Sequence, residues 1–262
     1  MTDEKDLTIS IPGEWALKKA FGPVLDEIGE DINKLYSNGR NKIIAFGYKK
    51  IIDINDGKIA NLRVTRDVFW NGSFTDEAIC AEYFGGILAS SRSANGKNDS
   101  GVYYTDLIKS LSSNQLKLHY LIYFSFNKFF ILNSQKLNLN PGQASELQLE
   151  NIFLSTNEIT NIIKINDKDV ITDLHAIYVK GLVGNFKLDY FKLKNNQMLP
   201  YLQVSPTPLG IQLYAIAHNR MDDWLNFSRM DFGIFDTIDT PKLQGNSIKN
   251  LLKNAGLDEV DQ

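Results

Sequence analysis

Apolar residues recur every three or four positions between Glu14 and Ile52, which is the period of one face of an α-helix. Pro23 suits the first turn of a helix better than its interior, so we expect a break near Phe21–Gly22. A long amphipathic helix of roughly 30 residues follows. Its repeating positions are Phe21, Leu25, Ile28, Ile32, Leu35, Gly39, Ile43 and Phe46.

The middle of the chain reads as a central helical bundle. Ser73 or Thr75, followed by acidic residues, suits the start of a helix over 78–91. Within it, Gly85-Gly86 indicates a bend or another backbone passing close by. The expected buried stripe is Ile79, Tyr83, Ile87 and either Leu88 or Ser90.

Two further helices and a linker are expected before residue 166. A short helix covers 105–111, and Ser113 caps a longer helix over 114–130. Apolar side chains surround most of that helix, which is typical of a buried position. Residues 133–165, with Pro141-Gly142, are interpreted as a linker or insertion.

The C-terminal half has the pattern of a winged-helix-like unit with a β-hairpin. Asn166 or Asp167 caps a helix that ends at Gly181, where a left-handed residue is expected. Alternating apolar residues over 185–194, a turn at Asn195-Asn196 and a returning strand over 198–204 predict the hairpin. The sequence SPTPLG at 205–210 then starts a final helix.

These patterns predict a mainly α (α+β) fold in five segments. They are an N-terminal tail with the long amphipathic helix (1–66), a central helical region (67–132), the linker (133–165), the winged-helix-like unit (166–220) and an acidic C-terminal tail (221–262).

Composition narrows the class of protein. The net charge is −3, and no apolar stretch is long enough to cross a bilayer. The acidic N-terminus lacks the features of a signal peptide, so we expect a cytoplasmic protein. One cysteine, Cys80, forms no internal disulfide and no Cys-rich zinc site, and we interpret it as structural.

Charge is uneven along the first 66 residues. Residues 1–31 carry 3 Lys and 8 acids, whereas 32–66 carry 8 Lys or Arg and 2 Asp. A solvent-exposed helix face whose charge changes from negative to positive along the chain explains this. The functional alternative is a surface that contacts an anionic partner. The candidate anion or partner contacts over the whole chain are Arg40, Lys42, Arg63, Arg66, Arg92, Lys168 and Lys180.

The helix after residue 166 is poorly suited to reading DNA bases. It offers Asp169, Thr172, Asp173, His175 and Tyr178, and it has no Arg. Base edges are usually read by Arg, Lys, Asn or Gln, and acids repel phosphates. We therefore favour packing or protein contact for this helix.

No catalytic, metal-binding or cofactor-binding signature is found in the sequence. His119, His175 and His218 are too far apart for a local metal motif, and no phosphate-binding glycine loop occurs. Arg92 with Asp99 is either a loop-closing pair or an anion site.

Two groups of aspartates carry weaker alternatives. Asp222-Asp223 is either an exposed helix start or an acid pair. Asp231, Asp236 and Asp239 could ligate a hard cation, but their spacing fits no EF-hand calcium loop.

Over residues 20–220 the chain resembles the Abi-alpha (abortive infection alpha) family of bacterial proteins. The resemblance rests on three places: Phe21-Gly22-Pro23 with 27–30, 76–91 leading into 111–115, and 207–210 (TPLG). It implies a cytoplasmic component of bacterial phage defence, and it assigns no role to any single residue.

The leading hypothesis is a non-enzymatic anti-phage component that acts by contact with a protein partner or with its own copies. One alternative is a nucleic-acid-binding regulator that uses the winged helix and the basic stretch 34–66. Another is a membrane-surface effector that uses the long amphipathic helix. No cofactor is expected, and the trigger and oligomeric state stay open.

Overall fold

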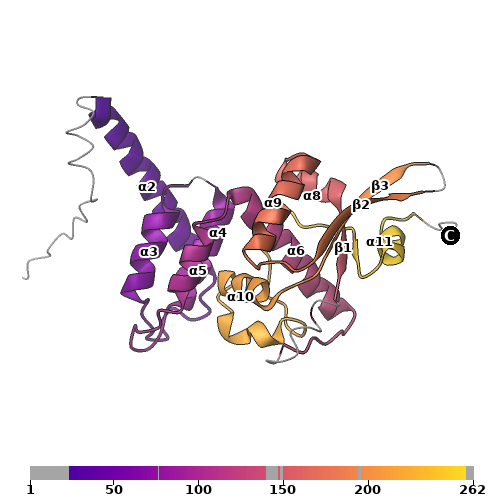
Figure 1. Ribbon diagram of the computed structural model, residues 1–262. Coiled ribbons are helices and arrows are strands. Elements are labelled where there is room, and N and C mark those ends of the chain that lie inside the picture. Colours follow the sequence, from indigo (N-terminus) through magenta and orange to yellow (C-terminus); the bar gives the residue numbers. More distant parts are fainter. Residues whose placement is uncertain (1–23, 76, 140–146, 148–149, 194–195, 258–262) are drawn as a thin grey trace, which may run out of the picture.

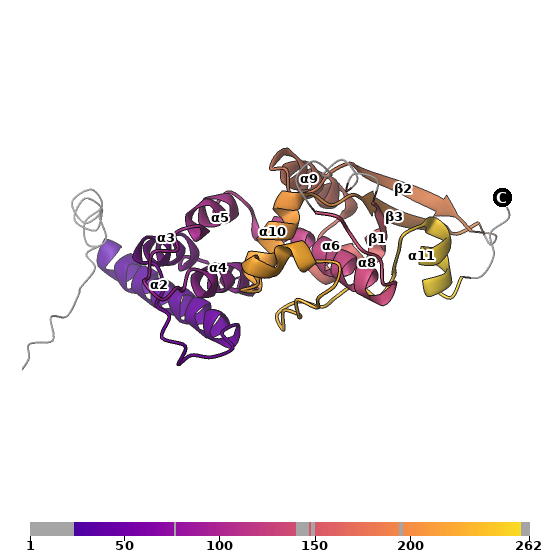
Figure 2. The same cartoon turned by 90° about the horizontal axis from the view of Figure 1, so that it is seen from below.

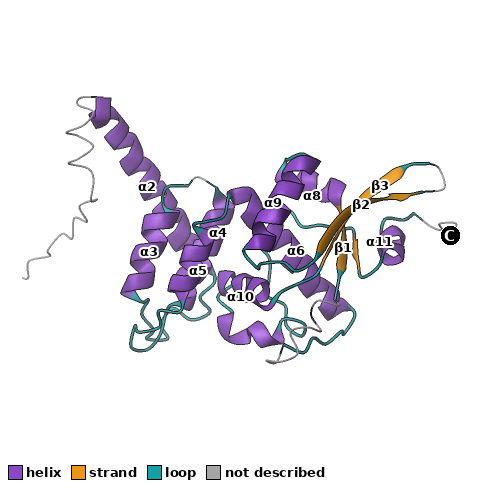
Figure 3. Ribbon diagram, viewed as in Figure 1, coloured by secondary structure: helices purple, strands orange, loops and turns teal. Residues whose placement is uncertain are grey.

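The computed structural model describes residues 24–75, 77–139, 147, 150–193 and 196–257. It has a mainly helical α+β fold with one four-stranded antiparallel sheet, as predicted for the fold class. The molecule is elongated, with helices alone at one end and the strands at the other (Figures 1, 2 and 3).

The helical end contains α2 (Val24–Lys49), α3 (Leu62–Gly72), α4 (Ala78–Ser90) and α5 (Gly101–Ile108). The part of the expected long helix before residue 24 lies outside the described residues. Helix α4 is apolar on nearly all sides and is buried along almost its whole length. A helix of this kind needs neighbours on every face.

The two glycines of α4 provide that close packing. A Cβ atom at Gly85 would lie 2.7 Å from the backbone nitrogen of Gly47 in α2, and one at Gly86 would lie 2.0 Å from the carbonyl oxygen of Ala217. Gly85-Gly86 therefore lets two backbones approach α4. Close backbone approach was one of the two expectations for this pair.

Helix α6 (Ser113–Leu132) runs through the centre and is buried over most of its length, as its apolar circumference predicts. Its cap differs by one residue from the expected Ser113. Ser112 caps it, accepting from the backbone of Gln115 while the Gln115 side chain accepts from the backbone of Ser112. This reciprocal capping box satisfies two otherwise unpaired N–H groups.

Helix α5 also differs from the expectation, because it begins at Gly101 rather than Thr105. A Cβ at Gly101 would meet Ile87 and Val64 at 3.0 Å, so tertiary packing selects the glycine there. Asn98 accepts from the N–H of Ser100 just before the helix. These contacts are not visible in the local pattern.

The segment 133–165 contains structure where a linker was expected. It includes β1 (Ile152–Ser155) and α8 (Thr156–Ile163). Strand β1 pairs with β3 (Met198–Val204) on one side and with β4 (Gln244–Gly245) on the other. A four-residue strand shows too little alternation to be recognised, and its position depends on partners 45 and more residues away.

Helix α9 (Asp167–Val179) and strands β2 (Phe186–Lys192) and β3 follow the predicted pattern. Asn166 caps α9 by accepting from Asp169, and Gly181 has a φ of 71°. The N–H groups of Gly181 and Leu182 donate to Tyr178 and Ile177, which closes the helix end. Strands β2 and β3 pair in register as a hairpin, and the sheet order is β2-β3-β1-β4.

Helix α10 (Pro208–Ala217) begins as expected, with Thr207 accepting from Gly210 and proline in the first turn. The segment after it, expected as a tail, packs on the rest of the molecule. It forms η1 (Met221–Asn226), β4 and α11 (Ile248–Asn254). Its aromatic residues Phe227, Phe232 and Phe235 are buried in the core.

Candidate functional site

The predicted contact residues of the N-terminal half do not form one patch of free cations. Arg63 lies 3.6 Å from Asp99, and Arg66 lies 2.6 Å from Asp67. Lys42 is half-buried and Arg40 is exposed on α2. Paired cations attract phosphate less strongly than free ones, which weakens the case for nucleic-acid binding here.

Arg92 has a different partner from the one expected. Its guanidinium donates to Asp56 at 2.6 Å and to the carbonyl of Lys58 at 3.1 Å, while Asp99 pairs with Arg63. Asp56 and Lys58 lie in the connection between α2 and α3, so Arg92 fastens that connection to the end of α4.

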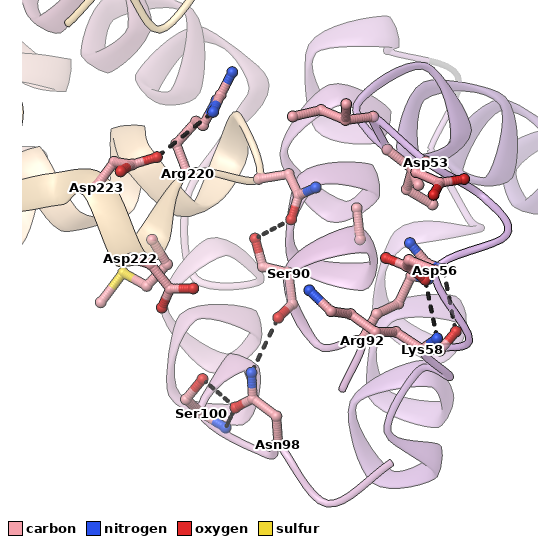
Figure 4. Close-up of a pocket in the computed structure, with 15 residues that line it drawn as sticks. Asp53, Asp56, Lys58, Ser90, Arg92, Asn98, Ser100, Arg220, Asp222 and Asp223 are labelled. Carbon is pink, nitrogen blue, oxygen red and sulfur yellow. Dashed lines mark hydrogen bonds and ion pairs between the residues drawn. The ribbon is translucent and has the colours of Figure 1, made fainter. Parts of the chain in front are cut away.

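This contact lies at the edge of a polar cavity of about 400 Å³ (Figure 4). Three segments line it: the α2–α3 connection, the end of α4 with the loop after it, and the turn from α10 into η1. The polar lining residues are Asp53, Asp56, Lys58, Ser90, Arg92, Asn98, Ser100, Asn219, Arg220, Asp222 and Asp223.

Most polar groups of the cavity bind one another. Arg220 pairs with Asp223 at 3.6 Å, and Ser90 donates to the side chain of Asn219 at 3.1 Å. Asn98 donates to the carbonyl of Ser90. Hydrogen bonds and ion pairs across the cavity therefore join the helical end to α10. Among the described lining residues, no nucleophile lies in hydrogen-bond contact with a general base, as covalent catalysis requires.

The three histidines do not meet in this cavity. Buried His119 contacts the hydroxyl of Tyr83 at 2.6 Å and the carbonyl of Gly210 at 3.1 Å. Buried His218 contacts the carbonyl of Tyr214 at 2.8 Å. Burial lowers the pKa of both to about 3. His175 is exposed on α9, against the ring of Phe186.

A buried ion pair escaped the sequence analysis. The ammonium group of Lys50 lies 2.7 Å from the carboxylate of Glu82 and 4.4 Å from the ring centre of Phe235. Burial lowers the pKa of Lys50 to about 8, although Glu82 opposes the shift. Because Lys50 is one of several lysines in the basic stretch, no local signal separates it from its exposed neighbours.

The outer surface of α9 and β2 contrasts with the buried Lys50–Glu82 pair. Lys168 and Lys180, two predicted contacts, lie exposed near its ends. Between them, Ile171 is 42% and Val179 is 80% exposed, although both are aliphatic. We call the exposed residues of α9 together with strand β2 the α9–β2 surface.

Aromatic rings connect the two elements of this surface. The ring of Phe186 in β2 lies 5.1 Å from that of His175 and 5.8 Å from that of Tyr178, measured between centroids. Farther along β2, Tyr190 is 57% exposed. Exposed bulky side chains that adjoin one another are typical of surfaces that bind partners.

The charges of this surface nearly cancel. Because Asp173 is buried, the described residues at the surface are four lysines (Lys168, Lys180, Lys187 and Lys192) and three aspartates (Asp167, Asp169 and Asp189). Asp167 and Asp169 lie in the first turn of α9. A surface that binds DNA phosphates carries an excess of cations. The α9–β2 surface is therefore suited to a protein more than to nucleic acid.

Comparisons with known proteins give no assignment. No family model, no curated protein and no solved structure matches the chain. Among the described residues, no three His, Cys, Asp or Glu side chains are grouped so as to hold a metal ion. No helix in that part of the chain is both long and apolar enough to cross a bilayer.

Proposed function

We propose that the described residues of 113–204, in place of the segment 166–220 expected from the sequence, form a winged helix and that its α9–β2 surface binds a protein. The order α6, β1, α8, α9, β2, β3 supports the first half of this proposal. A winged helix has one strand between its first and second helices and a β-hairpin after its third helix. The first strand pairs with the second strand of the hairpin. Here β1 pairs with β3.

The exposed aliphatic residues of α9 carry the second half of the proposal. In a winged helix that reads DNA, the third helix presents polar and basic side chains to the major groove. Helix α9 takes that position, but it exposes Ile171 and Val179 and begins with two aspartates. A protein partner would cover these aliphatic side chains.

We place this contact in a bacterial anti-phage system, as a cytoplasmic and non-enzymatic component. The support is the resemblance to the Abi-alpha family. The mutually paired groups of the polar cavity agree with a role without turnover. Hydrolysis of nucleotide, nucleic acid or peptide by the purified chain would contradict it.

The test compares two double variants of α9 in two assays. Ile171→Glu/Val179→Glu removes the aliphatic surface, and Lys168→Ala/Lys180→Ala removes its cations. We expect the first variant alone to abolish protection of cells against phage. We also expect wild-type protein to leave the anisotropy of a labelled DNA duplex unchanged at low salt. If the protein binds the duplex and this binding requires Lys168 and Lys180, the protein-contact proposal is wrong and the nucleic-acid alternative takes its place.

A second candidate function, contact with an anionic membrane surface, is favoured by the α2–α3 connection. Ile52 and Leu62 are 86% and 85% exposed, and Arg63 and Arg66 follow in α3. Because both arginines pair with aspartates, the support for this candidate is the exposed bulky apolar side chains, which suit insertion into a bilayer surface. Wild-type protein should then sediment with anionic vesicles, and Ile52→Glu/Leu62→Glu should not. Failure to sediment with either neutral or anionic vesicles would end this candidate.

A further inference from the structure

Strand β2 forms an open edge of the sheet. The strand order is β2-β3-β1-β4, and no strand adjoins the outer side of β2 in the described part of the chain. An edge strand presents unpaired N–H and C=O groups that another strand can bind. At seven residues, and without proline, β2 is long enough to pair along its length.

The hydrogen bonds beside the hairpin show which residues face outward. Leu193 donates to Gln197, and Ser205 donates to Asn185, so odd-numbered positions of this strand bind toward β3. Because hydrogen-bonding direction alternates along an antiparallel strand, the backbone groups of Phe186, Leu188 and Tyr190 point outward. Pro200, which has no N–H, lies opposite Tyr190 in β3 and agrees with this alternation.

We propose that a second copy of the chain pairs with this edge, β2 against β2, antiparallel about a two-fold axis at Leu188. This register places Leu188 opposite Leu188 of the second copy and Phe186 opposite Tyr190 of the second copy. These pairs are the outward-facing residues, so each pair can exchange two backbone hydrogen bonds. The N–H of Tyr190, which donates to Asp189 Oδ1 at 2.8 Å in the single chain, then donates to Phe186 of the second copy instead. The two sheets then become one continuous sheet.

Charge selects this register. With the axis at Leu188, each Lys187 lies opposite Asp189 of the other copy, in a position where side chains are close. An axis at Asp189 would oppose the two aspartates, and an axis at Lys187 would oppose the two lysines. Lys187 is exposed and Asp189 is half-buried, and the two already pair within one strand at 2.5 Å. Each can therefore bind a second opposite charge without losing the first.

The aromatic residues of the α9–β2 surface fit the same register. Phe186 already contacts His175 and Tyr178. Directly opposed residues of an antiparallel pair share a face of the sheet, so the second copy's exposed Tyr190 would extend this ring cluster. The arrangement is isologous, because each copy gives the same residues and receives the same residues.

The pairing has a consequence for the contact surface. A two-fold axis perpendicular to the sheet keeps both α9 helices on one face of it. The dimer would then present two copies of Ile171 and Val179 on the same side. The dimer does not depend on the proposed partner of α9, and a bivalent surface would raise the avidity for a partner that has two binding sites.

The mass of the full chain in solution tests the dimer. Sedimentation velocity of wild-type protein should give twice the chain mass of 29.7 kDa. Lys187→Glu should raise the dimer dissociation constant at least about ten-fold, because each attraction becomes a repulsion. Asp189→Lys should act similarly, and Lys187→Glu/Asp189→Lys should restore the dimer.

Lys192→Glu is the matched control. It makes the same charge change on the same strand, but Lys192 lies beyond the paired residues in this register and should leave the mass unchanged. Circular dichroism checks that every variant is folded. A wild-type monomer at all concentrations, or a dimer that Lys187→Glu does not weaken, would overturn the proposal. Ile171→Glu/Val179→Glu should leave the mass at the dimer value. Failure of the proposed α9 contact is therefore distinguishable from failure of the dimer.

Discussion

Two regions of the molecule use polar and apolar side chains in opposite ways. One is the junction, by which we mean the buried residues Lys50, Glu82 and His119 with their partners, and the other is the α9–β2 surface. At the junction, Lys50 and Glu82 bind each other out of solvent, and the buried His119 has a partner for each ring nitrogen. On the α9–β2 surface, Ile171 and Val179 are exposed to solvent with charges beside them.

The difference separates stability from binding. A buried polar group without a partner costs free energy of folding, so the junction is sensitive to any change in its pairs. An exposed aliphatic side chain contributes little to folding and gains free energy when a partner covers it. Substitutions at the junction should therefore alter unfolding, and those on the α9–β2 surface should alter association.

The largest expected effect is on acid stability. His119 and His218 have a pKa of about 3 in the folded chain, against about 6.5 when unfolded. Between these values the unfolded chain binds protons that the folded chain does not, so stability present above pH 6.5 is lost toward pH 3. Each histidine accounts for up to roughly 5 kcal/mol.

Urea unfolding at several pH values measures this loss. His218→Phe keeps a stacked ring and removes one proton-binding group, so its free energy of unfolding should fall less steeply between pH 6.5 and 3. Parallel curves for the variant and the wild type would show that burial of His218 does not drive the acid response.

Next in size is the buried ion pair. Lys50→Met leaves the Glu82 carboxylate buried without a counter-charge, which should destabilise the fold by about 3–5 kcal/mol. Lys50→Met/Glu82→Leu should recover most of this loss. The neighbouring Lys49 pairs with Asp236 at 3.4 Å in solvent, so Lys49→Met should cost less than about 1 kcal/mol. Equal losses at positions 49 and 50 would contradict the contrast drawn here.

The third-largest effect is expected at Gly86 of α4, which packs against the backbone of Ala217 in α10. Gly86→Ala places a Cβ 2.0 Å from the carbonyl oxygen of Ala217, so α4 and α10 must separate. We expect a loss of about 3 kcal/mol in thermal or urea unfolding. Gly57 has a φ of 71° and no atom within 4 Å of an added Cβ. Because asparagine tolerates that conformation, Gly57→Asn is a near-neutral control.

The smallest effect on stability is expected on the α9–β2 surface. Ile171→Glu/Val179→Glu changes two side chains outside the hydrophobic core, so its free energy of unfolding should lie within about 0.5 kcal/mol of the wild type. A larger loss would show that these side chains support the fold, and it would remove the distinction between the two regions.

Local signals predicted much of the C-terminal unit. The Asn166 cap, the left-handed Gly181 and the alternation of β2 each depend on residues close in sequence, and the structure has all three. Strand β1 and helix α8 were missed because β1 is short and its place depends on pairing with β3. Sequence patterns report the helix and strand periods, but they do not report distant partners.

The same reason limited the prediction of sites. Asp99 follows Arg92 closely in sequence, yet Arg92 binds Asp56, which a chain reversal brings near it. Lys50 and Glu82 are 32 residues apart, and each occurs in an ordinary helical pattern. Helical periodicity places Val170, Leu174, Ile177 and Tyr178 on one face of α9 and leaves Ile171 and Val179 outside it. The first three are buried, but Tyr178 is 46% exposed, so the pattern foresaw the exposed residues only in part.

Phage plating on cells that express three forms of the chain tests the central claim most directly. The forms are wild type, Ile171→Glu/Val179→Glu on the α9–β2 surface, and Asp53→Asn/Asp222→Asn in the polar cavity, at equal protein levels. If surface contact carries the function, wild type and the cavity variant should lower plating efficiency and the surface variant should not. Lost protection in the cavity variant, with protection kept in the surface variant, would contradict the account.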